Sequence, residues 1–483
     1  MNHRRVLHIL GLVLLVQGGA QLVPLALCLT AGDRGAVMGF SVSVAGTVLL
    51  GLLFRAFGSR GGELYRREGV LIVVGAWLLA SFSGAVPYFV GGAIPNPVDA
   101  LFESDSGFTT TGASILRDIE ALPRGVLFWR NFTQWLGGIG IVVLFVALLS
   151  ELGPGARFLF KLEVTGPKAE VLHAHVRDTA ISLSQVYLAL TAAQVVALLA
   201  LGLGLFDALT HTFSTVSTGG FSPYNASMAH FGAGAQLVVL VFMLASGVNL
   251  SLYYRLVRWR DLRVLRDVEL RTYLGLVAAA TCVVAISAAS QRQDGGPGFA
   301  AGLLAAAFNV VSIVTTSGFA TADFSLWPSL ALSTLVALMV AGGCAGSTSG
   351  GAKLIRTIIA WKATLREVRL TFSPNSVIAV SVGGEAVPES SVRSVVALLV
   401  LWLFAWGVGA VLLSIGDVDI VTAATASITT LSNVGPGLAA VGPLGNFAFF
   451  ADWQKLVMVA LMLLGRLEFF ALVSLFLPQF WRR

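Results

Sequence analysis

The stretch ALTHTFSTVSTGGFS, residues 208–222, decides the fold of this 483-residue chain, because related versions of it occur four times. The other three are ALFESDSGFTTTGAS (100–114), AAFNVVSIVTTSGFA (306–320) and AATASITTLSNVGPG (423–437). Each begins with an alanine twelve residues before a shared glycine and carries Ser, Thr or Asn just ahead of it. The aligned glycines are Gly112, Gly220, Gly318 and Gly435. A register kept four times predicts four copies of one structural unit.

Composition places these units in a membrane. Hydrophobic residues make up 56% of the chain and charged residues only 12%, with mean hydropathy +0.84. A soluble domain carries about 25% charged residues, so we expect a polytopic membrane protein. A bilayer crossing needs about 20 apolar residues. Stretches of that kind fall at 6–29, 36–56, 69–92, 125–149, 181–205, 234–256, 271–290, 328–349, 392–415 and 453–477. The sequence therefore predicts about ten transmembrane helices in an all-α fold.

Positive charge indicates the orientation of these helices. The loops at 55–67, 157–177, 255–271 and 353–393, with the two termini, hold most of the 31 lysine and arginine residues. The alternate loops hold only Arg34, Arg117, Arg124, Arg130, Arg292 and Lys455. Basic loops stay in the cytoplasm, so both termini are expected there, which requires an even number of crossings. The same rule explains the net charge of +6 without nucleic acid as a partner.

The four short segments near 97–111, 206–219, 299–317 and 419–433 then open to the outside. They are too short to cross, so each is expected to enter as a short helix and return as extended backbone. Such backbone is tolerated at membrane depth only where it lines a path for water or ions. The helix C-termini carry partial negative charge, which suits a cation. Four loops around one axis would place rings of carbonyl oxygens where they replace the hydration shell of potassium. Glycine is needed because the turn puts φ in a region that is costly for other residues.

Two other classes of membrane protein remain as alternatives. An intramembrane enzyme would need an embedded nucleophile–base or paired-carboxylate site, and neither is evident, so no enzyme activity is expected. A secondary transporter with broken helices would show two related halves rather than a fourfold register. The segment GSTSGGAK (346–353) is no phosphate-binding loop, because Ala352 stands where that motif needs lysine.

Several motifs resemble the Trk/Ktr/HKT superfamily of potassium transporters over essentially the whole chain. The loops TTTGAS (109–114), STGGFSP (217–223), TTSGF (315–319) and SNVGPG (432–437) look like its filter loops. GGCAGSTSGGAKLIR (342–356) and LLGRLEFF (463–470) are similar to the inner helices of its third and fourth repeats. An extra N-terminal helix pair is similar to the TrkH/TrkG branch of potassium uptake pore subunits. The resemblance implies that pair in 1–66 and pore repeats in 67–156, 157–262, 263–373 and 374–483.

The resemblance also implies how the ion is held. In the superfamily, backbone carbonyls at and just before each filter glycine bind potassium. Carried over, these residues are Thr110, Thr111, Gly112, Thr218, Gly219, Gly220, Thr316, Ser317, Gly318, Asn433, Val434 and Gly435. Sodium-preferring plant relatives have serine at the first of the four glycines, so Gly112 implies transport of K⁺, with Rb⁺ accepted. No organic cofactor is implied.

A gate is implied by the same resemblance. In the superfamily, an intramembrane loop beneath the filter occludes the path. The matching residues here are Gly342, Gly343, Gly346, Ser347, Thr348, Gly350 and Gly351. Arg466 is the most isolated charge in the sequence, and a mid-membrane arginine indicates a functional site. It is expected either to face the pore as an electrostatic barrier or to pair with Glu468.

The resemblance finally implies a setting and partners. The protein is expected in the bilayer of the bacterial inner membrane as a homodimer, with a cytosolic TrkA-type nucleotide-binding ring beneath it. The basic stretches 255–271 and 353–372 would serve either for docking or only for orientation. Whether transport is passive or coupled to protons or sodium, as in a symporter, stays open. Asp105 departs from the apolar residue usual in relatives, and His211 is expected either to pack or to titrate.

Overall fold

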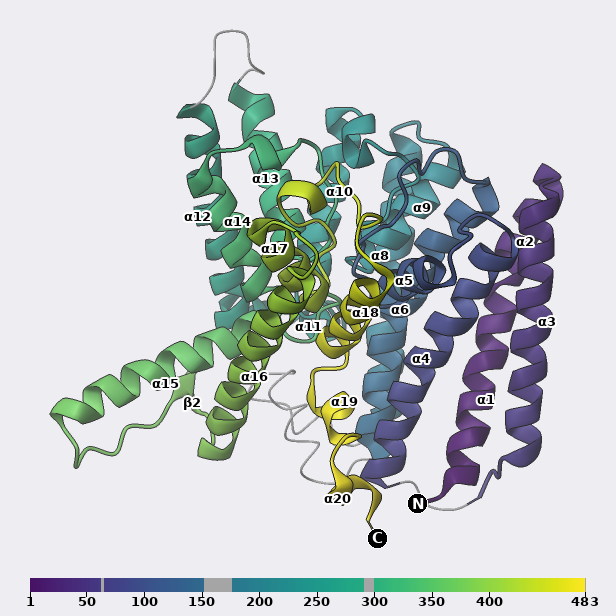
Figure 1. The fold of residues 1–483 in the computed structure, drawn as a ribbon. Helices are drawn as coiled ribbons and strands as arrows, with labels where there is room; N and C mark the ends of the chain where they lie inside the picture. The colour runs from purple at the N-terminus through teal and green to yellow at the C-terminus, as the bar shows by residue number, and fades with distance from the viewer. Residues whose placement is uncertain (62–64, 152–175, 291–298, 483) are drawn as a thin grey trace.

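The computed structural model describes residues 1–61, 65–151, 176–290 and 299–482 and is predominantly helical (Figure 1). The long helices are α1 (His3–Ala20) continued by α2 (Leu22–Ala31), α3 (Arg34–Phe57), α4 (Arg66–Val90), α6 (Arg124–Glu151), α8 (Val176–Ala200), α12 (Val268–Ser290) and α16 (Glu389–Leu413). Within the described part, strands are confined to one antiparallel pair, β1 (Ser381–Val382) and β2 (Glu385–Ala386). The predicted polytopic all-α fold is confirmed.

The long helices have the length and surface that a bilayer requires. Six helical stretches are long and apolar enough to cross it: His3–Ala31, Arg34–Phe57, Arg67–Val90, Ala180–Ala200, Val268–Ser290 and Glu389–Leu413. Helix α6 has 28 residues, or about 42 Å at 1.5 Å per residue, which also exceeds the hydrocarbon thickness. Large apolar side chains such as Val16, Phe404 and Val411 are exposed along these helices. A surface of this kind is expected against lipid and not against water.

Four short helices lie in the half of the molecule away from both chain termini (Figure 1). They are α5 (Pro97–Phe108), α9 (Leu205–Val216), α13 (Phe299–Val314) and α17 (Ile420–Leu431), and each ends four residues before its aligned glycine. Asn96 and Asp419 accept backbone N–H groups at the starts of α5 and α17, as helix caps do. The aligned alanines are buried in all four helices. The short helix predicted before each glycine is therefore confirmed.

The predicted spans at 234–256 and 453–477 are wrong as continuous helices. The first is divided into α10 (Ala233–Ser246) and α11 (Leu250–Trp259), bent by 90°, with the Asn249 side chain capping α11. The second stops at the end of α18 (Asp452–Arg466), because Glu468 and Phe469 both have positive φ. The interruption expected at 342–351 is present, between α14 (Ser329–Ala341) and α15 (Leu354–Phe372). Apolar composition alone does not reveal such breaks, because the residues on both sides still suit the bilayer.

The remaining elements are short. They are α19 (Phe470–Ser474), α20 (Pro478–Trp481), η2 (Ser227–His230), η3 (Leu262–Arg266), η4 (Phe324–Leu326) and η5 (Ala439–Val441). The two termini lie at the same end of the helices (Figure 1), as an even number of crossings requires. The expected repeat boundary at 156/157 and most of the basic stretch 157–177 lie outside the described residues.

Candidate functional site

Four glycine loops, residues 110–112, 218–220, 316–318 and 433–435, follow the four short helices with one shared backbone conformation. The aligned glycines have φ between 75° and 99°, as predicted, and the residues two positions earlier have φ between 54° and 56°. Those earlier residues are Thr110, Thr218, Thr316 and Asn433. A non-glycine residue in this region costs about 1–3 kcal/mol. Its recurrence in all four repeats marks a built feature of the loops.

The amide groups of the glycine loops bond back to the ends of the short helices. In the first loop, Thr111 N donates to the Ser106 carbonyl at 2.9 Å. The matching bonds are Gly219 N to Ser214 O (2.8 Å), Ser317 N to Ser312 O (2.8 Å) and Val434 N to Thr429 O (2.9 Å). Among the twelve loop carbonyls, only that of Gly219 accepts a hydrogen bond from the described residues, from Gln134 at 2.7 Å. The loops thus leave buried carbonyl oxygens available to a ligand.

The four glycine loops meet in cyclic order. A Cβ atom added to Gly112 would lie 2.1 Å from the Gly219 carbonyl oxygen of the next loop. The same construction places Gly220 against Ser317 O (1.7 Å), Gly318 against Val434 O (2.2 Å) and Gly435 against Thr111 O (2.7 Å). Because these contacts run from the first loop to the fourth and back, the loops surround one axis. All twelve residues expected from the sequence as filter residues are in this ring.

Side-chain hydrogen bonds also stabilise the ring of glycine loops. The hydroxyl six residues before a glycine donates to the carbonyl just after it in three repeats: Ser106 to Ala113 (2.6 Å), Ser312 to Phe319 (2.6 Å) and Thr429 to Pro436 (3.1 Å). In the second repeat Asn131 Nδ2 donates to the Phe221 carbonyl at 2.7 Å instead. Asn433 Nδ2 donates to Thr111 Oγ1 at 2.9 Å and so joins the fourth loop to the first. These hydrogen bonds from surrounding side chains help to hold the ring in place.

The glycine-rich segment 342–351 lies directly against this ring. Three bonds connect them: Gly350 N to Thr316 Oγ1 (2.6 Å), Gly351 N to Ser432 O (2.9 Å) and Thr348 Oγ1 to Val216 O (3.0 Å). Val216 and Ser432 are at the C-terminal ends of α9 and α17. The segment therefore covers the ring on the side to which the short helices direct their carbonyl ends.

The other residues of segment 342–351 fix its path. Gly342, Gly346 and Gly351 have φ of 65° to 75°, which glycine adopts without strain. The segment is bonded to the bend between α10 and α11, through Cys344 N to Gly247 O (3.0 Å) and Leu250 N to Gly346 O (3.1 Å). Gly343 packs against the Gly247 carbonyl, and Ser347 Oγ is 2.7 Å from Ser349 Oγ. The broken helices of the second and third repeats thus support each other.

Arg466 is buried at the end of α18 beside the same segment. Its Nη1 donates to the Thr348 carbonyl at 3.0 Å, and its Nη2 is 3.5 Å from the Gly137 carbonyl. Glu468 instead pairs with Arg356, at 2.8 Å. The described contacts thus give Arg466 backbone carbonyl partners and Glu468 a different arginine, which favours the pore-facing alternative over an Arg466–Glu468 ion pair.

Asp105 and His211 are the two residues of the short helices whose roles the sequence leaves open. Asp105 is fully buried, and Ser81 of α4 donates to it at 2.6 Å. His211 is also fully buried; its Nδ1 donates to the Asp207 carbonyl at 2.8 Å and its ring packs against Phe231. The packing alternative for His211 is the one that the structure supports.

Sequence reasoning missed the contribution of α6. Arg130 falls within the predicted span 125–149 but is counted with the outer-loop charges; in the structure it is buried within α6 and forms an ion pair with Glu103 at 2.5 Å. Gln134, one turn later, donates to Gly219 O and accepts from Phe221 N at 3.0 Å. The run RNFTQ (130–134) inside an apolar helix was the available signal, because polar residues at membrane depth are costly unless they have a role.

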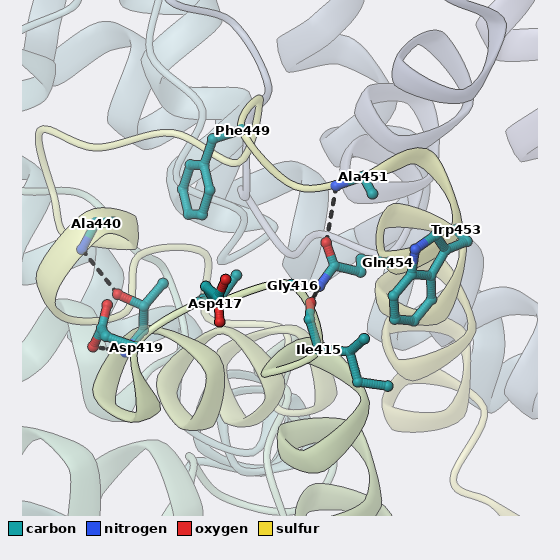
Figure 2. A pocket seen from close by; sticks show the side chains of 11 residues that line it. Ile415, Gly416, Asp417, Asp419, Ala440, Phe449, Ala451, Trp453 and Gln454 are labelled. Carbon is teal, nitrogen blue, oxygen red and sulfur yellow. Dashed lines mark hydrogen bonds between the residues drawn. The ribbon is translucent and has the colours of Figure 1, made fainter.

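A pocket of about 480 Å³ lies in the fourth repeat, and none of its lining residues belongs to a glycine loop (Figure 2). Two of its polar side chains hold backbone: Gln454 bonds Ala451 N and the Ile415 carbonyl, and Thr422 accepts from Ala440 N. Asp419 caps α17. These contacts give the pocket a structural explanation that is separate from the glycine ring.

Comparison with known proteins agrees with this geometry. Residues 43–483 match the family described as TrkH, cation transport protein. The chain is similar to the Trk system potassium uptake protein TrkH of Halomonas elongata (38% identity) and of Escherichia coli K12 (36%), with complete coverage of both chains in each case. It is also similar to the crystal structure of the potassium transporter TrkH from Vibrio parahaemolyticus, with 33% identity, a TM-score of 0.89 and complete coverage of both chains. These are transport proteins and not enzymes, and the present chain belongs to the TrkH family of cation transport proteins.

Proposed function

We propose that this protein takes up potassium across the bacterial inner membrane through a pore whose selectivity filter is the ring of four glycine loops. The observation that carries the proposal is the closed ring of glycine–carbonyl contacts. Carbonyl oxygens arranged around one axis can replace the hydration shell of K⁺. The C-terminal ends of four short helices add partial negative charge beside the ring. The relatives named as potassium uptake proteins support K⁺ as the transported ion.

Rescue of a bacterium that lacks its own potassium uptake systems tests this proposal. We expect the protein to restore growth at low potassium and to catalyse uptake of radioactive rubidium. Immunodetection in the membrane fraction controls for expression. Absence of both growth and uptake, with the protein present in the membrane alongside a TrkA-type partner, would overturn the proposal.

The glycine-rich segment 342–351 and Arg466 are proposed as the gate below this filter. The segment is bonded to the ends of α9 and α17 and to the third loop, so it stands across the path leaving the ring. Arg466 is bonded to the carbonyl of Thr348 within it. A buried guanidinium repels a cation arriving from the filter, and opening therefore requires both groups to move.

Shortening the segment is expected to raise ion flux. Deletion of Gly346–Ser349 removes the Thr348 contacts, so rubidium uptake should increase while the preference for potassium over sodium stays unchanged. Thr348→Val keeps the side-chain volume but removes the bonds to Val216 and Ser246. We expect it to act in the same direction with smaller effect. Unaltered uptake in a deletion variant that reaches the membrane would count against the segment as a gate.

The assembly is proposed to be a homodimer bound to a cytosolic TrkA-type nucleotide-binding ring. Helix α15 projects from the helical body on the side of the termini (Figure 1) and exposes Trp361, Val368 and Phe372. Exposed apolar side chains beside basic residues suit a protein partner. Rescue with and without the partner tests this part separately, and we expect full uptake only when both are present.

A further inference from the structure

In three of the four repeats, the residue nine positions before the aligned glycine faces the chain that leaves the loop. Glu103 accepts from Ser114 Oγ at 3.0 Å and Ile115 N at 3.0 Å. His211 Nε2 is 3.2 Å from Ser222 Oγ, and Asn309 Nδ2 donates to Thr321 Oγ1 at 3.2 Å. In three repeats, then, a polar side chain of the short helix holds the residue two or three places after the glycine. Because the three residues are a glutamate, a histidine and an asparagine, their amino acid types do not reveal that they hold the chain in the same way.

In the fourth repeat, the chain leaving the loop is held by the residue one position earlier in the short helix. Ala426 is at the equivalent place and offers no polar group, but Thr425 Oγ1 accepts from Leu438 N at 3.0 Å. Leu438 is again three residues after its glycine. In every repeat, a side chain of the short helix is therefore bonded to the chain two or three residues after the aligned glycine. The ring dimensions depend on these fastenings as well as on the glycines.

The first repeat differs from the others because its fastening is ionic. Glu103 pairs with Arg130 at 2.5 Å, and their side chains are 0% and 2% exposed. Arg130 Nη1 also donates to the Ser222 carbonyl at 2.9 Å, and its guanidinium lies 3.7 Å from the centre of the Phe221 ring. One buried pair thus holds the outgoing chains of two adjacent loops.

We propose that the Glu103–Arg130 pair is a specificity-determining element that positions the first and second glycine loops and thereby sets the preference for potassium over sodium. Both are positioning residues, since the ion would meet the loop carbonyls and not these side chains. The pair fixes Ser114 and Ser222, each two residues after its glycine, relative to one another. Loss of that restraint lets carbonyls of the first and second loops approach a smaller ion. This inference rests on the proposed filter.

Glu103→Gln tests the pair with little change in volume. Glutamine can still bond Ser114 or Ile115, but Arg130 loses its counter-charge. We expect rubidium uptake to persist while inhibition by sodium becomes about tenfold stronger relative to the parent, equivalent to about 1.4 kcal/mol. The apparent affinity for rubidium should change more than the maximal rate, because the ring is altered and the gate is not.

Ser114→Ala is a second variant that leaves the buried ion pair intact. It removes the hydroxyl that donates to the Glu103 carboxylate and accepts from Leu116 N. A smaller increase in sodium inhibition is therefore expected even if Glu103→Gln fails to accumulate. Asp99→Asn is the matched control. Asp99 is on the same short helix as Glu103, and its substitution breaks an ion pair with Lys455 of α18, at 2.5 Å, without touching a glycine loop. We expect its sodium inhibition to equal that of the parent.

The outcomes separate this inference from the proposed function. A parent protein that takes up no rubidium defeats the proposed filter itself. A potassium-selective parent, with Glu103→Gln and Ser114→Ala both retaining its sodium inhibition, overturns only the inference. Equal loss of selectivity in Asp99→Asn would also overturn it, because a general weakening of α5 would then explain the effect.

Discussion

Substitution of Gly112 by serine is expected to let sodium compete with potassium. The added Cβ would lie 2.1 Å from the Gly219 carbonyl oxygen, so that oxygen must move. Serine must also adopt φ near +81°, which costs a residue with a Cβ about 1–2 kcal/mol. Both effects displace carbonyls of the first and second loops. We expect the preference for potassium over sodium, measured as sodium inhibition of rubidium uptake, to fall by about tenfold or more, or at least about 1.4 kcal/mol.

Gly92→Ser is the matched control for this experiment. Gly92 has φ +74°, almost that of Gly112, but a Cβ there would meet no atom within 4 Å. It therefore carries the same backbone strain without the collision. We expect unchanged ion preference in Gly92→Ser. Unchanged discrimination in Gly112→Ser, at parental membrane levels, would show that the first loop does not form part of the filter.

Replacement of Arg466 by alanine is expected to give the second large effect, an increase in flux. The guanidinium is fully enclosed and bonded to the Thr348 carbonyl of segment 342–351. For an ion that passes about 8 Å from this charge, Coulomb's law gives about 2 kcal/mol at an effective dielectric constant of about 20. That corresponds to a roughly thirtyfold change in rate where this barrier limits transport. We expect faster rubidium uptake with unchanged sodium inhibition, since the ring itself is untouched.

Arg466→Lys distinguishes charge from anchoring. Lysine keeps the positive charge but cannot direct two donor groups to Thr348 and Gly137 as arginine does. Flux close to that of the parent would identify the charge as the barrier. Flux as high as that of Arg466→Ala would assign the effect to the lost anchoring bonds. Parental flux in Arg466→Ala itself would exclude both roles.

Much of the architecture could be predicted because its signals are local. Hydropathy located the membrane stretches, and the fourfold register located each short helix to within a few residues. The positive φ of the aligned glycines followed from the need for a tight turn. The positive φ at Thr110 and its counterparts did not follow, because threonine normally avoids that region. At these positions the hydrogen bonds of the loop outweigh the preference of the residue for negative φ.

The breaks in two inner helices and the role of α6 could not be predicted in this way. The residues around Asn249 and Glu468 continue the apolar pattern, so only their packing partners reveal that the helix ends. Arg130 lies near the start of the predicted span 125–149, where an arginine can equally serve as an orientation signal. Its partner, Glu103, is 27 residues away in another helix.

The sequence by itself determined the membrane class, the fourfold unit and the glycines on which the ring is built, since each depends on spacing or composition along the chain. Only the tertiary structure decided the cyclic order of the loops, the partner of Arg466 and the pair that links the first two loops. Those features join residues as far apart as Arg466 and Gly137, 329 positions, or Asn433 and Thr111, 322 positions. Contacts over such separations arise when helices pack, and no local pattern in one chain specifies them.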